Sequence, residues 1–217
     1  MCYENYSICI LAGGQSSRMG SKDKGLAPFL GHSLIEHILT HLQYGFIDDD
    51  EKFTIISNRP QNYAFLQSTY PVTIKPDIIP GMGALGGLFS ALTYADTPLV
   101  VVLACDMPFI DTSIITKGIK FISTHPHSIF IPFGNDKLQP FHSVYRAELC
   151  IPFIKQALTI NQKEVIHWII QADPFIHYVN IRKTQKFTPF FNINTDEDLI
   201  TAEKIWIKQQ SKKKTGG

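Results

Sequence analysis

A run of six apolar residues, LVVVLA at positions 99–104, constrains the fold more than any other feature of the sequence. A strand with one face in water alternates apolar and polar side chains, whereas a strand covered on both faces is apolar throughout. This run contains no polar position. We therefore predict a strand at the centre of a parallel sheet whose two faces are both covered.

Segments typical of strands and helices alternate along the rest of the chain. Strands are predicted at residues 7–11, 52–57, 72–75, 99–104, 128–132 and 139–145. Helices are predicted at residues 33–42, 86–95, 111–124 and 196–210. This alternation predicts an α/β fold with a mostly parallel central sheet and helices on both faces. We expect one domain over residues 1–210 and a disordered tail at 211–217.

The composition argues against several classes of protein. Hydrophobic residues make up 44% of the chain and the formal net charge is +1. Neither a disordered chain nor a nucleic-acid binder acting through bulk charge is therefore expected. No secretory signal is recognisable, and no apolar stretch is long enough to span a membrane. The scattered cysteines lack the CxxC spacing of zinc and redox sites. We expect a cytoplasmic protein that binds neither nucleic acid nor membrane.

The strongest functional signal is a glycine-rich segment, LAGGQSSRMGSKDKGL at positions 11–26, which directly follows the first predicted strand. Glycines permit sharp turns that expose successive backbone N–H groups, and such groups form a nest for anions. Arg18 and Lys24 can add charge-assisted hydrogen bonds to phosphate oxygens. The segment matches neither the P-loop pattern nor the pattern GxGxxG. It indicates a phosphate site of another kind, and a charged surface turn is the alternative.

A carboxylate, Asp106, ends the predicted central strand. A charged group at the end of a buried strand costs free energy unless it is paired or binds a metal. Capping of the next helix is the alternative role, although Asp111 and Thr112 lie nearer to the start of that helix. The position therefore favours a functional role for Asp106.

The glycine-rich segment, read as LAGGxSxRMGxxDKGL, resembles the amino-terminal signature of the MobA family, the molybdenum cofactor guanylyltransferases. This family belongs to a larger nucleotidyltransferase group with a Rossmann-like fold. Members of that group carry an arginine and a lysine with the separation that Arg18 and Lys24 show here. Further segments resemble the family in order along the chain: Ser57-Asn58-Arg59, Asp77, PGMGALGGL at 80–88, Cys105-Asp106-Met107-Pro108 and FNINT at 191–195.

The sequence departs from the family pattern in two segments. Ala84 stands where the family usually has proline. Gln139 stands where a basic residue is common, and Ser143 replaces an alanine. The second departure affects the side of the site that is expected to bind the acceptor substrate.

The resemblance implies a nucleotidyl transfer. The terminal phosphate of molybdopterin would attack the α-phosphorus of GTP, pyrophosphate would leave, and molybdopterin guanine dinucleotide would form. Mg²⁺ is the implied cofactor. Because both reactants are anions, positioning and charge neutralisation would carry most of the catalysis, without a covalent intermediate. Proteins that deliver molybdopterin and proteins that mature molybdoenzymes are the implied partners.

The resemblance also implies roles on the phosphate side. Asp106 would be the Mg²⁺ ligand, because this ion is usually held by one or two carboxylates together with substrate phosphates. Lys24 and the backbone amides of Gly13 and Gly14 would neutralise the phosphates. Arg18 would hold the β- and γ-phosphates.

Four further residues are candidates for binding the nucleoside. Leu11 and Ala12 would supply backbone contacts to the base. Asp77 would accept hydrogen bonds from the guanine edge or the ribose, with a turn-forming role as the alternative. Asn58 would also hold the nucleotide, although a capping asparagine is equally consistent with its position.

The acceptor side is less well defined by the sequence. Asn192 and Asn194 would face molybdopterin or the metal, and Asn194 could alternatively cap the last helix. Gln139 is the third candidate on this side. For His142, a packing role and a ligand role are equally consistent with the sequence.

Two other functions remain as alternatives. A cytidylyltransferase or a sugar-phosphate nucleotidyltransferase shares the fold and the chemistry, but the paired glycines and the Asp-Lys-Gly sequence favour the guanylyltransferase. A non-catalytic nucleotide-binding protein of the same fold would be expected to lack Lys24 or Asp106, and both are present.

Overall fold

The computed structural model describes residues 4–12, 23–46, 53–126, 129–171, 176–180 and 189–215. The strands are β1 (Tyr6–Leu11), β2 (Pro28–Phe29), β3 (His32–Ser33), β4 (Phe53–Ile56), β5 (Val72–Lys75), β6 (Leu99–Ala104), β7 (Ile129–Gly134), β8 (Lys137–Leu138), β9 (His142–Arg146) and β10 (Ile176–Asn180). The helices are α1 (Leu34–Gly45), α2 (Gly83–Tyr94), α3 (Thr112–Thr124), α4 (Ala147–Thr159), α5 (Val165–Gln171) and α6 (Asp196–Thr215), with 3₁₀ segments η1 (Lys24–Leu26) and η2 (Pro60–Ser68).

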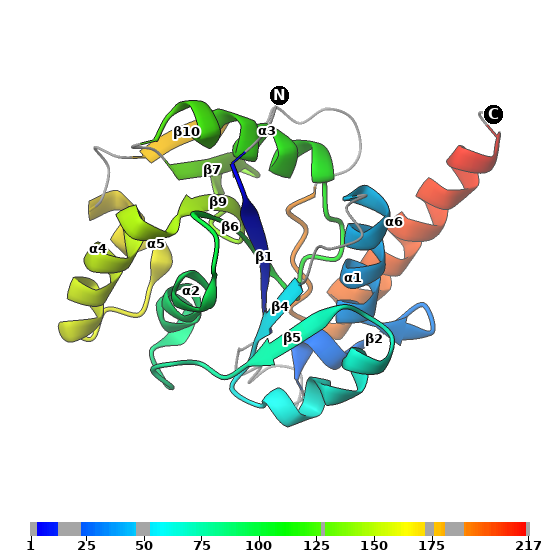
Figure 1. The fold of residues 1–217 in the computed structure, drawn as a ribbon. Coiled ribbons are helices and arrows are strands. Elements are labelled where there is room, and N and C mark those ends of the chain that lie inside the picture. The colour runs from blue at the N-terminus through cyan, green and yellow to red at the C-terminus, as the bar shows by residue number, and fades with distance from the viewer. Residues whose placement is uncertain are drawn as a thin grey trace.

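One twisted sheet forms the centre of the molecule (Figure 1). Its strands lie in the order β10-β7-β9-β6-β1-β4-β5, and β8 pairs with the edge of β7. The strands β1, β4, β5 and β6 pair in parallel, whereas β9 is antiparallel to both β6 and β7. The predicted α/β fold with a mostly parallel sheet is therefore confirmed, with β9 as an antiparallel insertion.

The central strand β6 is buried on both faces, as its sequence predicts. Leu99, Val101 and Leu103 belong to one apolar cluster, which also holds the inner faces of α1 and α3. Val100 and Val102 belong to a second cluster, with the inner faces of α2, α4 and α5. The alternation of side chains along a strand thus divides the core into two layers, one on each side of the sheet.

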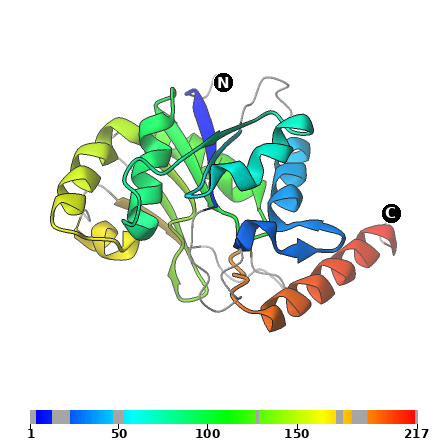
Figure 2. The ribbon, with the colours of Figure 1, turned by 90° about the horizontal axis from the view of Figure 1, so that it is seen from below.

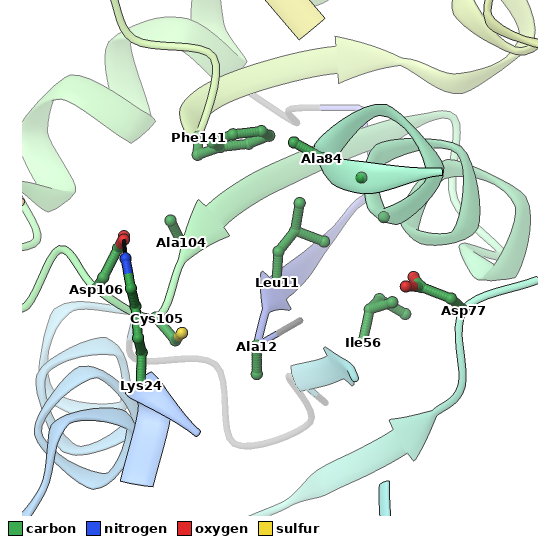
Figure 3. A pocket seen from close by; sticks show the side chains of 12 residues that line it. Leu11, Ala12, Lys24, Ile56, Asp77, Ala84, Ala104, Cys105, Asp106 and Phe141 are labelled. Atoms are coloured by element: carbon green, nitrogen blue, oxygen red, sulfur yellow. Dashed lines mark hydrogen bonds and ion pairs between the residues drawn. The ribbon is translucent and has the colours of Figure 1, made fainter. Parts of the chain in front are cut away.

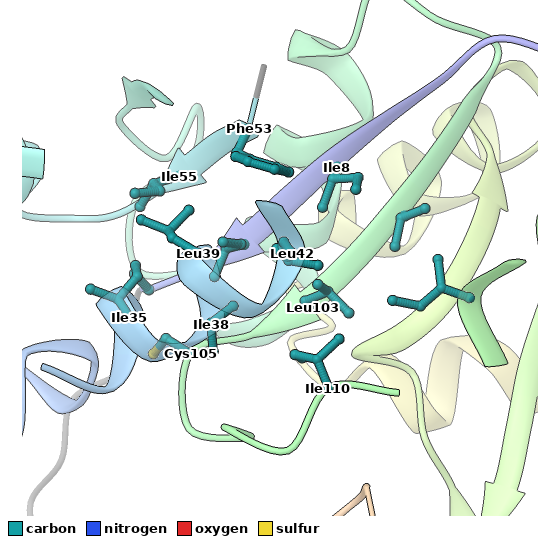
Figure 4. Packing of buried hydrophobic residues seen from close by; sticks show 14 of the residues in the cluster. Ile8, Ile35, Ile38, Leu39, Leu42, Phe53, Ile55, Leu103, Cys105 and Ile110 are labelled. Carbon is teal, nitrogen blue, oxygen red and sulfur yellow. The ribbon is translucent and has the colours of Figure 1, made fainter. Parts of the chain in front are cut away.

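Helix α1 shows how the local sequence fixes one of these layers. Its start is held by Glu36, whose carboxylate accepts the backbone N–H of Ser33 at 2.8 Å. Its apolar residues recur at helical spacing and are fully buried: Leu34, Ile35, Ile38, Leu39 and Leu42. Figure 4 shows this face lying across the side chains of β1, β4 and β6. The spacing of apolar residues that predicts this helix is therefore also what gives it an apolar face to pack against the sheet.

A smaller apolar cluster joins the carboxyl-terminal part of the chain to the β2–β3 hairpin. Phe29 and Leu34 meet Phe109, Ile193 and Ala202 in this cluster. Helix α6 consequently runs beside α1, and its end projects past the body of the molecule (Figures 1 and 2). Among the described residues, no helix is both long and apolar enough to cross a membrane.

The observed helices and strands differ from those predicted from the sequence at the carboxyl-terminal end and in the middle of the chain. Helix α6 continues to Thr215, five residues beyond the end predicted for it at residue 210. Lysine is a good helix former, which is consistent with this extension. Helices α4 and α5 and strand β10 were not predicted. Helix α2 begins three residues before the predicted start, at Gly83.

Candidate active site

The candidate site lies at the edge of the sheet where the parallel strands β1, β4, β5 and β6 end. In such sheets, ligands bind outside the carboxyl ends of the strands. A pocket at this edge is lined by residues from the strand ends, η1 and the start of α2: Leu11, Ala12, Lys24, Ile56, Asp77, Gly83, Ala84, Gly87, Ala104, Cys105, Asp106 and Phe141. Figure 3 shows Lys24 and Asp106 on one side of Leu11 and Asp77 on the other.

Lys24, Asp106 and Asn194 form a polar cluster on one side of the pocket. The ammonium nitrogen of Lys24 lies 3.3 Å from Asp106 Oδ2 and donates a hydrogen bond to Asn194 Oδ1 at 2.7 Å. The side chains of Lys24 and Asp106 remain 20% and 21% exposed. A ligand in the pocket can therefore reach both charges, and the sequence prediction that these residues belong to one site is consistent with their geometry.

Two backbone features hold Asn194 in this cluster. The N–H of Ile193 donates to the carbonyl of Asp106 at 2.9 Å, which ties the segment before α6 to the end of β6. The carboxylate of Asp198 accepts the N–H groups of Asn194 and Thr195, each at 2.9 Å. These N–H groups, that of Asn194 first, hold the pKa of Asp198 below its usual range. The Asp198 N–H in turn donates to Thr195 Oγ1 at 3.1 Å, so the two residues form a capping box at the start of α6 that also fixes Asn194.

The alternative role considered for Asp106 was to cap helix α3, and the structure gives that role to another residue. The carboxylate of Asp111 accepts the backbone N–H of Ser113 at 2.9 Å and caps this helix. Asp106 is consequently free of the capping role, as its distance from the helix suggests. Its carboxylate faces Lys24 instead.

Asp77 forms part of the opposite side of the pocket. Its Oδ1 atom is buried and has no hydrogen-bond partner among the described residues. Burial raises the pKa of Asp77, and the nearby Ser90 and Asn58 side chains offset part of this effect. Ser90 Oγ donates its hydrogen to the carbonyl of Gly86 at 2.8 Å. Asp77 therefore brings to the pocket wall a carboxylate with one oxygen that lacks a hydrogen-bond partner among the described residues.

The space beside Asp77 depends on Gly87 in α2. A Cβ atom at Gly87 would lie 3.5 Å from a methyl carbon of Leu11 and 3.8 Å from Asp77 Oδ1. These are ordinary contact distances, so alanine would fit but would take up the room between the two side chains. The missing side chain therefore leaves room for about one methyl group beside Leu11 and Asp77 in the pocket lining.

The structure places the remaining predicted residues differently. Asn58 is exposed and lies beside Asp77 rather than in the pocket lining. Asn192 has a buried Oδ1 atom without a partner in the described chain. Gln139 is fully buried, and its amide nitrogen donates to the carbonyl of Gly134 at 2.7 Å, away from the pocket lining. Gly13, Gly14 and Arg18 lie outside the described residues.

His142 is a packing residue in the structure. Its ring is buried edge-on against Phe190, and its Nε2 lies 3.4 Å from the carbonyl of Asp111. Burial lowers the pKa of His142 to about 4. The neutral ring contributes to the core beneath the site rather than to the pocket lining.

Phe141 and Gly87 are pocket residues that the sequence analysis missed. Because β9 is antiparallel to β6, its first residue pairs with the end of β6, in the register Leu103 to His142. The residue before β9, Phe141, therefore reaches the pocket. A sequence reading that places ligands only after strands cannot find such a residue. Gly87 belongs to the PGMGALGGL segment that resembles the family, but no role was predicted for this residue.

The comparisons with known proteins agree with this fold. The chain is 24% identical to molybdopterin-guanine dinucleotide biosynthesis protein A from Archaeoglobus fulgidus over 93% of this chain and 99% of that one, with a TM-score of 0.75. A 4-diphosphocytidyl-2C-methyl-D-erythritol synthase from Anaerococcus prevotii shares the fold at 15% identity and a TM-score of 0.68, over 92% and 95% of the two chains. The fold is thus that of nucleotidyltransferases.

The sequence comparisons are more specific. The chain is 32% identical over 211 residues to a probable molybdenum cofactor guanylyltransferase from Clostridium perfringens strain SM101, covering 92% of this chain and 98% of its relative. Residues 8–172 match the MobA-like NTP transferase domain. The chain therefore belongs to the MobA-like NTP transferase family, as its glycine-rich segment suggests.

Proposed function

We propose that this nucleotidyltransferase transfers GMP from GTP to the terminal phosphate of molybdopterin. The observation that carries the proposal is one pocket with two chemically different sides. Lys24 and Asp106 offer charges on one side, and Asp77 offers a buried, unpartnered acceptor on the other. A nucleotide needs both, because its phosphates are anionic and its base presents hydrogen-bonding groups.

The phosphate side accounts for the transfer chemistry. An oxygen of the acceptor phosphate forms a bond to the α-phosphorus of GTP, the bond from that phosphorus to the oxygen bridging to the β-phosphate breaks, and pyrophosphate leaves with its charge. Lys24 neutralises the negative charge on the triphosphate. Fixed charges act strongly in a site that excludes water, so positioning and neutralisation suffice without a covalent intermediate. The backbone amides of Gly13 and Gly14 and the side chain of Arg18 are expected to assist.

The oxygen donors of the site fit Mg²⁺. Asp106 presents a partly exposed carboxylate, and Asn194 presents an amide oxygen that contacts the same lysine. Mg²⁺ prefers oxygen ligands and is commonly held by one or two carboxylates plus substrate phosphates. Asp106 and Asn194 would hold it. When bound, the ion would supply positive charge to the phosphates.

The base side accounts for the choice of guanine. Guanine presents two N–H donors on one edge, whereas the same edge of cytosine presents a carbonyl and a single amino group. The Asp77 carboxylate can accept from both guanine donors. The absence of a side chain at Gly87 keeps this part of the pocket lining, beside Leu11 and Asp77, unobstructed. Backbone groups at Leu11 and Ala12 would complete the contacts, with Asn58 at the entrance.

On the acceptor side, Asn192 remains the candidate because its side-chain oxygen lacks a partner in the described chain. Gln139 is better explained as the residue that holds the turn before β9, which sets the position of Phe141. Proteins that deliver molybdopterin, and proteins that receive the product, remain expected partners.

The decisive experiment measures product formation with purified protein, Mg²⁺, molybdopterin and GTP, CTP or ATP in turn. We expect the guanine dinucleotide from GTP only, and loss of product in Asp106→Ala. Asp96→Ala is the matched control, because Asp96 is an exposed aspartate outside the pocket lining. A product with CTP would favour the cytidylyltransferase alternative and remove Asp77 from base recognition. Tight GTP binding without any product would point to a different phosphate acceptor.

A further inference from the structure

Tyr63 in η2 is a fully buried tyrosine that does not line the pocket. Its hydroxyl makes a short hydrogen bond to the carboxylate of Asp23. The same hydroxyl lies 3.4 Å from the carbonyl oxygen of Ala12. Ala12 directly follows β1, and Asp23 directly precedes Lys24. One hydroxyl therefore reaches both the end of the first strand and the residue that introduces the lysine.

Tyr63 also approaches Gly25, the residue that follows Lys24 in the chain. A Cβ atom at Gly25 would lie 2.7 Å from the Tyr63 hydroxyl oxygen and 3.4 Å from Cβ of Cys105. Tyr63 and Cys105 thus occupy the space where a side chain at Gly25 would stand. The residues next to Gly25 and Cys105 in the chain, Lys24 and Asp106, are those that form the ion pair.

We infer that Tyr63 is a positioning residue that holds Ala12 and Asp23 at a fixed separation and thereby sets Lys24 opposite Asp106. The inference rests on the proposed function, because it assigns the purpose of this arrangement to phosphate handling by Lys24. It adds a residue outside the pocket to the machinery. Tyr63 does not itself line the pocket. It acts through its contacts with Ala12, Asp23 and Gly25.

The hydroxyl is suited to this role because it remains a donor. Burial, with further contributions from Cys105 and Asp23, raises the pKa of Tyr63 far above its usual range. The single hydrogen lies between two acceptors, and Asp23 is the nearer one. Among the described residues, no other hydrogen-bond donor to the Ala12 carbonyl is recorded. Loss of the hydroxyl would remove the hydrogen bonds to Ala12 and to Asp23 together.

The first test is Tyr63→Phe, which keeps the ring that fills the core and removes only the hydroxyl. Tyr70→Phe is the matched control, since the Tyr70 hydroxyl also reaches one side chain, Thr40, and one backbone carbonyl, Glu36. We expect kcat/KM for GTP to fall about tenfold to a hundredfold in Tyr63→Phe, because a small misplacement of a catalytic group has effects of this size. Tyr70→Phe should leave it unchanged. Equal effects of the two variants would overturn the inference.

The second test needs no substrate and therefore separates this inference from the proposed function. The reactivity of the Lys24 amine toward an acylating reagent is measured by mass spectrometry, relative to the exposed lysines of the same molecule. We expect Lys24 to be labelled several-fold faster in Tyr63→Phe than in the wild-type protein or in Tyr70→Phe. Unchanged labelling would overturn the inference even if transfer activity fell. Absence of GMP transfer in the wild-type protein would contradict the proposed function alone.

A third measurement asks whether Tyr63 acts through Asp23. Asp23→Ala should reproduce the kinetic and labelling changes of Tyr63→Phe, and the double variant should be no worse than either single one. Asp23→Asn keeps an acceptor oxygen and should restore most of the lost activity. Multiplicative losses in the double variant would show two independent roles and would overturn the coupling through Asp23.

Discussion

Two ion pairs lie near opposite ends of strand β6, and they differ in the number of hydrogen bonds between the partners and in the burial of the cation. At one end, Arg146 makes two hydrogen bonds to Glu4, at 2.7 Å and 2.8 Å. The Arg146 side chain is 5% exposed, and it also donates to the carbonyl of Ile122. At the other end, Lys24 meets Asp106 through one contact of 3.3 Å, with both side chains open to the pocket.

The difference separates a pair that joins elements from a pair that can bind a ligand. The Glu4–Arg146 pair links the residues before β1 to the end of β9, and its arginine is buried while Glu4 remains 30% exposed. The hydrogen bond and charge of Arg146 hold the pKa of Glu4 below its usual range. The Lys24–Asp106 pair leaves charge unsatisfied where a phosphate and a cation would enter. We therefore expect substitutions at the first pair to affect stability and substitutions at the second to affect activity.

The largest expected effect is at the open pair. Asp106→Ala should lower GMP transfer by about a thousandfold, because it removes a charge that acts on the reacting phosphates. The thermal midpoint should change little, since Asp106 is partly exposed and its partner can turn to solvent. Transfer rates and a thermal melt of the same preparation measure both quantities. Unaltered transfer in a folded variant would remove Asp106 from the site.

The next effect is at the closed pair and concerns stability. Arg146→Ala should lower the free energy of unfolding by about 3 kcal/mol, because it removes the hydrogen bonds to Glu4 and to the Ile122 carbonyl and the packing of a buried side chain. For a chain of this size, such a loss corresponds to a fall in the thermal midpoint of roughly 6–12 °C. Activity per folded molecule should be retained. Lys155→Ala, which removes an exposed cation from α4, is the control. If Arg146→Ala lost activity without losing stability, the Glu4–Arg146 pair would not have the structural role assigned to it.

A smaller effect is expected at Asp77. Asp77→Asn replaces an acceptor with a group that can also donate, so discrimination between GTP and other nucleotides should fall about tenfold to a hundredfold. Competition experiments with GTP and ITP measure this directly, because inosine lacks the exocyclic amino group. Equal discrimination in the variant and the wild-type protein would exclude contact between Asp77 and the guanine edge.

The smallest expected effect is a difference in pH dependence between Glu4 and Asp77. The folded protein lowers the pKa of Glu4, so its stabilising contribution is present above the usual value of 4.5 and is lost as the pH falls through the lowered value. Burial raises the pKa of Asp77, so its contribution is present below the usual value of 3.8 and is lost as the pH rises through the raised value.

Denaturant unfolding of Glu4→Gln and Asp77→Asn at pH 7 and pH 4 tests this difference. The stability deficit of Glu4→Gln should shrink at the lower pH. Asp77→Asn should be most stable, relative to the wild-type protein, at pH 7, and this advantage should decrease on acidification. Changes of the same sign in the two variants would show that the two carboxylates do not differ as described.

Much of the fold was predictable because local patterns and tertiary burial agree. Strand β6 is apolar throughout and is buried throughout, and both β5 and β6 have the predicted bounds. Helix α4 was missed although Cys150, Ile154, Ala157 and Leu158 recur at helical spacing. Pro152 lies within it and is a residue that normally interrupts a helix. Packing of the apolar face against the sheet evidently outweighs that local cost.

The candidate site was predictable where it follows parallel strands. Asp77 and Asp106 follow strands, and the topology brings both to one pocket. The reversal of β9 could not be foreseen, because strand direction depends on which neighbours a strand pairs with rather than on its own sequence. Phe141 was missed for this reason. Gln139 was predicted to lie at the site, but its side-chain amide donates to the carbonyl of Gly134 at the end of β7.

The hydrogen bond from Lys24 to Asn194 also determines when the site becomes complete during synthesis. Its two residues are 170 positions apart. A chain leaves the ribosome amino end first, and its early parts begin to fold before the rest is made. A nascent chain that ends after α5 already contains Lys24, Asp106 and the pocket between them. It lacks Asn194 and the cluster in which Ile193 anchors the last segment. Incomplete chains of this protein should therefore carry the charges of the site without its full geometry.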